Sequence, residues 1–212
     1  MRCKNCNNST FYHIENNYIK CKNCKKKYSL KKLKKDTKII EYFCNNINAN
    51  EAAKLLHINY RTAKNRYDQL RYKLSKYLEE EYNKTAKDYS NYEEYYYFNT
   101  KQRQKKIKSL FEAVNIIGFY SEDKVYTLLM PQIPSRTKEE SEYFQEYLSW
   151  HKIYSKESYK KTNLKKFWLF LEENLKKYKG FNQEHFFYYL KECEFKFNYS
   201  KKEQITILNK IY

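Results

Sequence analysis

The sequence predicts a multi-module α+β protein, and three observations carry that prediction. Two Cys-x-x-Cys pairs stand within the first 30 residues, segments with helical apolar spacing follow up to about residue 82, and short apolar runs then alternate with amphipathic segments up to residue 198. Short continuous apolar runs indicate strands, and apolar residues at three- and four-residue spacing indicate helices. We expect a ribbon at 1–30, a helical domain at 31–82 and a mixed domain with C-terminal helices at 88–212.

The charge balance predicts a polyanionic partner. The 212 residues include 43 Lys and Arg against 25 Asp and Glu, a formal net charge of +18. This surplus exceeds what solubility requires, and nucleic acid is the leading candidate. A membrane surface is the alternative, but the sequence has no apolar stretch of about 18 residues and no signal-peptide pattern. We expect no membrane association and an intracellular protein, cytoplasmic and nucleoid-associated if the host is bacterial.

The first module is predicted to hold a structural zinc ion. Cys3-x-x-Cys6 and Cys21-x-x-Cys24 present two thiolate pairs at zinc-ribbon spacing. The segment between them can form a hairpin that is too small to fold without metal. Two disulfides in a secreted mini-domain are the alternative, although the other two cysteines lie in separate predicted helices. Several lysines on the ribbon surface could contact phosphate: Lys4, Lys22, Lys25, Lys26 and Lys27.

The second module is predicted to contain three helices. Residues 25–38 are basic and are interpreted as a linker, after which Thr37, Asn50 and Asn59 are candidate helix caps. A short helix, a tight turn and a helix that opens with basic and amide side chains are typical of a helix-turn-helix. A generic three-helix bundle with a basic face is the alternative. The candidate DNA contacts are Tyr60, Arg61, Thr62, Lys64, Asn65 and Arg66.

The third module is predicted to combine strands and helices. Residues 92–98 and the apolar runs 113–120 and 125–130 are expected strands, the last two forming a hairpin around residues 121–124. The near-continuous apolarity of the hairpin indicates burial on both faces. Helices are expected at 137–150 and in two amphipathic segments between residues 162 and 198, which are separated at Gly180 with Asn182 as a candidate cap.

The residues of the last two helices resemble a known family. Asn163-x-x-x-Phe-Trp, Lys177-x-x-Gly180 and His185-Phe-x-x-Tyr-Leu-Lys-Glu-Cys-Glu-Phe-x-Phe-Asn198 resemble the closing block of Merlin-type (ISXO-like) insertion-sequence transposases of the DDE superfamily. The order of ribbon and helix-turn-helix is similar to the N-terminal half of the same family. The resemblance implies a ribonuclease-H-like third module and a catalytic centre of three metal-binding carboxylates.

The carboxylate positions that the resemblance implies are not intact. Glu93 stands where the family has its first catalytic aspartate, and Lys165 stands where it has its last glutamate. No apolar strand followed by Asp occurs between the predicted helix at 137–150 and the expected strand at 151–155, so the second carboxylate and its strand are interpreted as deleted. Two-metal strand transfer needs all three groups. Mg²⁺ is therefore expected only if catalysis survives.

The preferred hypothesis is a sequence-specific protein that binds double-stranded DNA, derived from an insertion-sequence transposase, with a regulatory or DNA-organising role and possible self-association. We lean against enzymatic activity. One alternative is an active DDE transposase that cleaves DNA and transfers strands with divalent metal. The other is a basic structural component of a nucleoprotein assembly.

Overall fold

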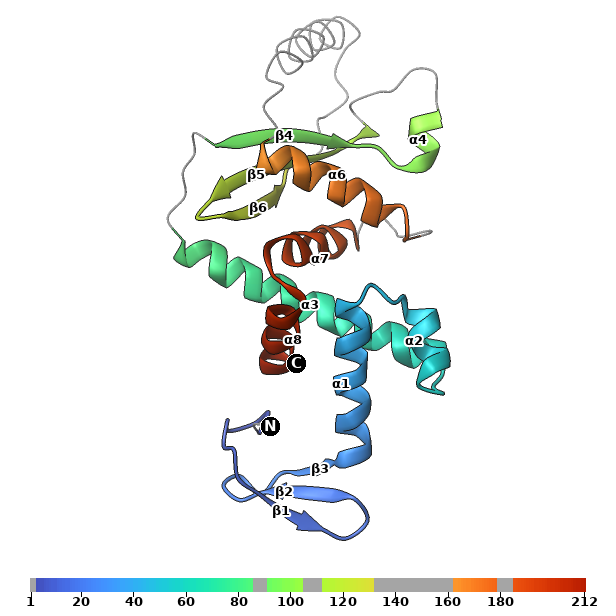
Figure 1. The fold of residues 1–212 in the computed structure, drawn as a ribbon, viewed down its shortest axis with the longest axis vertical. Coiled ribbons are helices and arrows are strands. Elements are labelled where there is room, and N and C mark those ends of the chain that lie inside the picture. Colours follow the sequence, from blue (N-terminus) through green and yellow to red (C-terminus); the bar gives the residue numbers. More distant parts are fainter. Residues whose placement is uncertain (1–2, 86–90, 105–111, 132–161, 179–184) are drawn as a thin grey trace, which may run out of the picture. The chain divides into compact units, whose positions relative to one another are not determined.

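The fold is described from a computed structural model, which covers residues 3–85, 91–104, 112–131, 162–178 and 185–212. The chain divides into two compact units (Figure 1). Unit 1 comprises residues 1–84 and 199–212, and unit 2 comprises residues 85–198. The predicted helix at 137–150, the strand at 151–155, Gly180 and Asn182 lie outside the described residues.

Unit 1 begins with a small antiparallel sheet. Strands β1 (Phe11–Ile14), β2 (Tyr18–Cys21) and β3 (Lys27–Ser29) pair in that order. The β1–β2 turn contains Asn16 and Asn17 at φ values of 62° and 60°, a region that Asn tolerates better than most residues. Within the described ribbon, the fully buried side chains are Cys3, Ile19 and Cys21. So little apolar burial cannot hold three short strands together unaided.

Helix α1 (Leu30–Cys44) follows β3 directly, which corrects the interpretation of residues 25–38 as a linker. The side chain of Ser29 caps the helix by accepting a hydrogen bond from the Lys32 backbone. Thr37 is not the cap; it lies inside the helix and donates to the Leu33 carbonyl. The lysines that indicated a linker occupy the solvent-facing side, while Ile39, Ile40 and Phe43 are buried. A charged run on a solvated helix face is difficult to distinguish from a linker by composition.

Two further helices complete the predicted trio. The side chain of Asn48, rather than the expected Asn50, caps α2 (Ala49–Leu55) by accepting hydrogen bonds from the backbone amides of Asn50 and Glu51. The chain turns through His57 at φ 48° and enters α3 (Tyr60–Lys84), where the Asn59 side chain accepts from the Arg61 backbone as predicted. Apolar residues at three- and four-residue spacing form the buried side of α3: Ala63, Tyr67, Leu70, Leu74 and Leu78.

The last helix also belongs to unit 1. Helix α8 (Lys201–Ile211) packs against α1 and α3, and its buried residues are Gln204 and Leu208. Ser200 and Glu203 form a reciprocal capping box at its start. The sequence prediction placed residues 199–212 with the third module, whereas they group with residues 1–84. An amphipathic stripe shows that a helix packs, but not on which partner.

Unit 2 contains a second antiparallel sheet, in the order β4–β5–β6. Strand β4 (Tyr92–Tyr97) and the β5–β6 hairpin (Val114–Ser121 and Lys124–Leu129) match the three expected strands. The hairpin turns at Glu122 and Asp123, which both adopt positive φ. A short helix, α4 (Thr100–Gln104), follows β4. Phe119 and Tyr126 are buried on one face and Ile116 and Val125 on the other, so both faces of the hairpin exclude solvent.

Helices α6 (Asn163–Leu175) and α7 (Phe186–Asn198) cover one face of this sheet (Figure 1). The Trp168 ring stacks on Tyr95 of β4, with centroids 4.6 Å apart and planes inclined by 6°. Gly118 of β5 makes this close approach possible, because a Cβ there would lie 2.6 Å from the Trp168 ring and 3.0 Å from Leu164. The core beneath the helices includes Tyr97, Ile116, Phe167, Leu171 and Leu190.

Polar side chains of α7 also form hydrogen bonds with the backbone groups on the outer edge of β6. Asn198 exchanges two hydrogen bonds with the backbone of Val125. The Glu194 carboxylate accepts from the backbone and the hydroxyl of Thr127, and Lys191 donates to the Thr127 carbonyl at 2.8 Å. Lys191 and Glu194 are themselves paired at 2.8 Å and almost fully buried. The helix thus takes the place of a further strand along this edge.

No helix in the described part of the chain is long and apolar enough to cross a membrane.

Candidate metal centre and nucleic-acid interface

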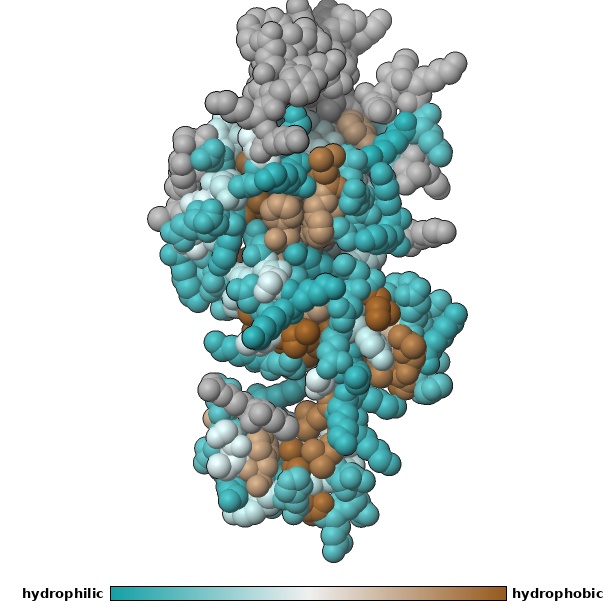
Figure 2. All heavy atoms as spheres, in the orientation of Figure 1, coloured by the Kyte–Doolittle hydropathy of each residue, from teal (hydrophilic) through white to brown (hydrophobic). Residues whose placement is uncertain are grey.

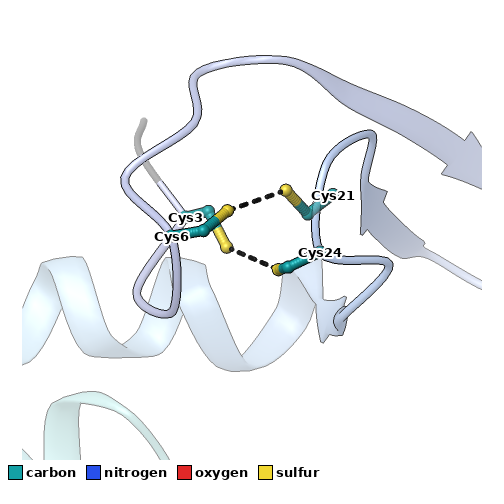
Figure 3. Close-up of side chains that lie close together, drawn as sticks. All are labelled: Cys3, Cys6, Cys21 and Cys24. Carbon is teal, nitrogen blue, oxygen red and sulfur yellow. Dashed lines mark hydrogen bonds between the residues drawn. The ribbon is translucent and has the colours of Figure 1, made fainter.

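The four ribbon cysteines come together as the spacing predicted. Their sulfur atoms all lie within 4.8 Å of one another, and Cys3 and Cys24 are 3.4 Å apart while Cys6 and Cys21 are 3.6 Å apart (Figure 3). A tetrahedral zinc ion with bonds of about 2.3 Å needs sulfurs roughly 3.8 Å apart. Four cysteine sulfurs in this arrangement could bind a metal such as zinc, which would close the ribbon as a structural ion.

The protein environment supports thiolates at this centre. Burial would raise the pKa of the Cys3 thiol, but hydrogen bonds from the Tyr28 hydroxyl and from the backbone of Asn5 and Cys6 outweigh it and lower the pKa to about 6. The pKa of Cys21 is also lowered: backbone N–H groups of Cys24 and Asn23 outweigh its burial. The Cys6 pKa rises to about 11 despite a favourable backbone bond from Asn8, because burial and the neighbouring sulfurs oppose a further negative charge. A cation at the centre would offset that repulsion.

The Tyr28 hydroxyl contacts one of the four cysteines, an interaction that the cysteine spacing does not predict. It lies 3.1 Å from Cys3 Sγ, and burial and the Cys3 thiolate raise its pKa, which keeps it protonated as a donor. Hydrogen bonds of this kind orient metal ligands. Its only signal in the sequence is an aromatic residue four positions after the last cysteine.

Removing this hydroxyl should weaken metal binding. We expect Tyr28→Phe to lower zinc affinity by about 10- to 100-fold, the usual effect of losing such a partner. Competition with a chromogenic chelator measures the change, and Tyr18→Phe, at an exposed ribbon tyrosine, is the matched control. Equal zinc affinities for the two variants would contradict a role for the Tyr28 hydroxyl.

The start of α3 presents most of the candidate DNA contacts to solvent. Tyr60 is 52% exposed, and Arg61, Thr62, Lys64 and Asn65 are also exposed. Lys64 pairs with Asp68 one turn later, at 2.9 Å. Arg66 differs from the others, because its guanidinium forms an ion pair with the nearly buried Asp36 of α1. The structure thus places Arg66 where it joins α3 to α1.

Glu93 and Lys165, which the resemblance aligns with two carboxylate positions, both form hydrogen bonds with Thr162. Thr162 caps α6 and accepts from the Lys165 backbone, so Lys165 stands in the first turn. Glu93 of β4 accepts a hydrogen bond from the Thr162 hydroxyl at 2.7 Å and another from the Trp168 indole at 3.0 Å. Both carboxylate oxygens therefore hold the start of α6 against the sheet. The region implied for the second carboxylate lies outside the described residues.

A nearby carboxylate, Glu172, should make unit 2 sensitive to acid. It accepts hydrogen bonds from Tyr95 and from Arg103, the latter at 3.0 Å. Burial would raise its pKa, but the bonds from Arg103 and Tyr95 outweigh this and lower it. A lowered folded-state pKa means that the group stabilises the fold above its ordinary pKa of 4.5 and that this contribution disappears as pH falls through the lowered value.

We therefore expect Glu172→Gln to reduce the acid dependence of unit 2. Its stability deficit relative to wild type should be largest near neutral pH and should shrink below about pH 4.5. Thermal unfolding followed across this range measures the effect, with the exposed Glu173→Gln as control. A deficit that is constant with pH would show that the Glu172 charge does not contribute.

Comparison with known proteins gives one short match. No protein-family profile matches the chain, and no solved structure matches it. A segment of 46 residues, 21% of the chain, is 48% identical to an uncharacterised transposase-like protein of Haemophilus influenzae. The match covers 37% of that protein's length. This likeness supports a transposase-related origin.

Proposed function

We propose that this chain is a sequence-specific duplex DNA-binding protein of transposase origin, which reads bases with the start of α3. The observation that carries the proposal is the short α2, the turn at His57 and the exposed polar start of α3 in one compact unit with a four-cysteine ribbon. A helix-turn-helix inserts its second helix into the major groove by its N-terminal residues. The transposase-like relative and the net charge of +18 support a DNA partner.

We propose separate tasks for the first residues of α3. Arg61 and Asn65 are four residues apart, so they share one side of the helix, opposite the buried Ala63 and Leu70. Arg can bridge guanine and Asn can bridge adenine with two hydrogen bonds each. Tyr60, Thr62 and Lys64 flank this pair and suit phosphate or thymine-methyl contacts. Arg66, paired with Asp36, is proposed to fix the angle of α3 rather than to touch a base.

The surface supports the same interpretation. On the face drawn in Figure 2, hydrophilic residues cover most of the described surface and hydrophobic atoms form separate small patches. Nucleic-acid interfaces are more polar and more positively charged than protein–protein interfaces. Several exposed ribbon lysines, including Lys22 and Lys25, could add phosphate contacts.

Substitution of Arg61 or Asn65 should weaken the preference of the protein for one DNA sequence over another. We expect Arg61→Ala or Asn65→Ala to reduce discrimination at one base position by about 1 to 3 kcal/mol, because each loses a bidentate contact. Affinities for the preferred duplex and for its single-base variants measure this. Glu80→Ala, an exposed change far along α3, is the control. Unchanged discrimination in both variants would place base recognition elsewhere.

We further propose that strand transfer is not the activity of this chain. In support, Glu93 is engaged by Thr162 and Trp168, and Lys165 brings a cation to the start of α6, where a metal ion would be repelled. Among the described residues, the four ribbon cysteines are the cluster of His, Cys, Asp or Glu side chains close enough together to hold a metal ion. Strand-transfer assays with oligonucleotide ends and Mg²⁺ or Mn²⁺ test this, and joined products would overturn it.

A further inference from the structure

A second cluster of cations lies in unit 1, beside the ion pair of Arg66 with Asp36. Lys4 Nζ lies 4.8 Å from the ring centroid of Tyr212, and Lys73 Nζ lies 5.5 Å from the same centroid. The two ammonium groups are therefore no more than about 10 Å apart. Lys4 comes from the first cysteine knuckle, Lys73 from α3 and Tyr212 from the residue after α8. Three segments distant in the sequence converge here.

Among the described side chains, the acidic one that pairs with this cluster's cations is Asp36. One oxygen of Asp36 pairs with Arg66, and the other lies 3.8 Å from Lys4. Lys73 instead donates to the backbone oxygens of Ile211 at 3.0 Å and of Tyr212 at 3.5 Å. Lys32 stands one turn before Asp36 on the same side of α1 and adds a fourth cation. Positive charge exceeds negative charge at this point of the unit.

One part of the cluster is nearly buried, and the other part is open to solvent. The side chains of Arg66 and Asp36 are 16% and 11% exposed, so this ion pair is the nearly buried part. The side chain of Lys4 is 43% exposed, and Lys32 and Lys73 are exposed. Like charges held close together repel, and an anion that accepts hydrogen bonds from several ammonium groups lowers that cost.

We propose that Lys4, Lys32 and Lys73 form a second anchoring site, which binds a backbone phosphate of nucleic acid. This inference rests on the proposed function for the identity of the polyanion. Lysine contacts to phosphate carry no sequence information but fix the register of a protein on the duplex. Because Lys4 lies between two cysteines of the metal centre, the site would tie the orientation of the ribbon to that of α3 on the same DNA molecule.

The salt dependence of DNA binding tests the proposal. Binding of a labelled duplex to the full chain is measured by fluorescence anisotropy from about 50 to 200 mM KCl. The test variant is Lys4→Gln with Lys73→Gln. The control is Lys84→Gln with Lys202→Gln, which removes the same charge from exposed positions near the end of α3 and the start of α8. Circular dichroism and zinc content verify that each variant is folded.

We expect the slope of log affinity against log salt to fall by about 1 to 2 in the test variant, and by less in the control. Lys4→Arg with Lys73→Arg should retain the wild-type slope, because the charge is kept. This charge-conserving pair also shows whether any loss in the Gln variant comes from a disturbed α8. Sequence preference should be the same in all of these proteins.

Three results would overturn the inference. Equal slopes in the test and control variants, with strong wild-type binding, would reject the anchoring site and leave the proposed function intact. A wild-type protein without salt-dependent DNA binding would reject the proposed function itself. The third result combines two measurements. If the NMR resonances of Lys4 and Lys73 shift with millimolar inorganic phosphate, but the test variant keeps the wild-type slope of log DNA affinity against log salt, the site binds a small anion instead.

Discussion

Replacing Cys21 by Ser is expected to abolish stoichiometric zinc binding and to unfold residues 3–29 of the ribbon. Cys21 is fully buried, and its sulfur lies 3.6 Å from that of Cys6 on the other knuckle. The ribbon offers almost no apolar core beyond Ile19. Metal binding supplies about 10 to 16 kcal/mol in small zinc-dependent domains, so loss of one ligand removes most of what holds these strands together.

Zinc content by metal analysis and amide hydrogen exchange of β1 to β3 measure this effect. The ribbon amides should lose protection in Cys21→Ser and in chelator-treated wild type, while those of α1 and α3 keep theirs. Cys44→Ala is the matched control, because Cys44 is buried in α1 and is not part of the cluster. A ribbon that keeps its protected amides after chelation would contradict a structural metal.

Replacing Glu194 by Ala should destabilise unit 2 by about 3 to 5 kcal/mol. The substitution leaves the Lys191 ammonium, which is almost fully buried, without its counter-charge at 2.8 Å. It also removes the acceptor for the backbone N–H of Thr127, which is fully buried on the edge of β6. Both groups then lie in the interior without the water they would contact when unfolded.

Chemical denaturation of the full chain, followed by a probe in unit 2 such as Trp168 fluorescence, measures the loss. Glu194→Gln keeps acceptors for Thr127 but removes the charge, so its cost should fall between that of wild type and Glu194→Ala. Glu173→Ala, on the exposed side of α6, should change stability by no more than about 0.5 kcal/mol. A Glu194→Ala variant as stable as this control would show that the edge contacts contribute little.

Local patterns predicted most elements of both units. The cysteine spacing predicted the four-sulfur cluster, and three- and four-residue apolar spacing predicted the buried sides of α3, α6 and α7. The hairpin was evident because Glu122 and Asp123 suit a turn between two apolar runs. These features depend on residues within a few positions of one another, and a single sequence contains that information.

Features that depend on distant segments were not predictable. The ion pair of Arg66 with Asp36 and the closure of the β6 edge by Glu194 and Asn198 join residues from 30 to 73 positions apart. The helices that α8 packs against lie further away still in the sequence. The lysine-rich start of α1 was interpreted as a linker because charge on an exposed helix face resembles a solvated coil. Asp36, the lone acidic residue among those lysines, was the available signal of a buried contact.

Selection from a pool of random DNA duplexes tests the central proposal most directly. The full zinc-loaded chain is incubated with the pool near physiological salt, and the bound duplexes are sequenced over successive rounds. Sequence-specific binding by α3 predicts enrichment of a short motif that contains guanine and adenine positions, with enrichment at one of them lost in Arg61→Ala. Bound duplexes that remain as random as the starting pool would contradict the proposal and would favour a basic protein that binds the DNA backbone without reading bases.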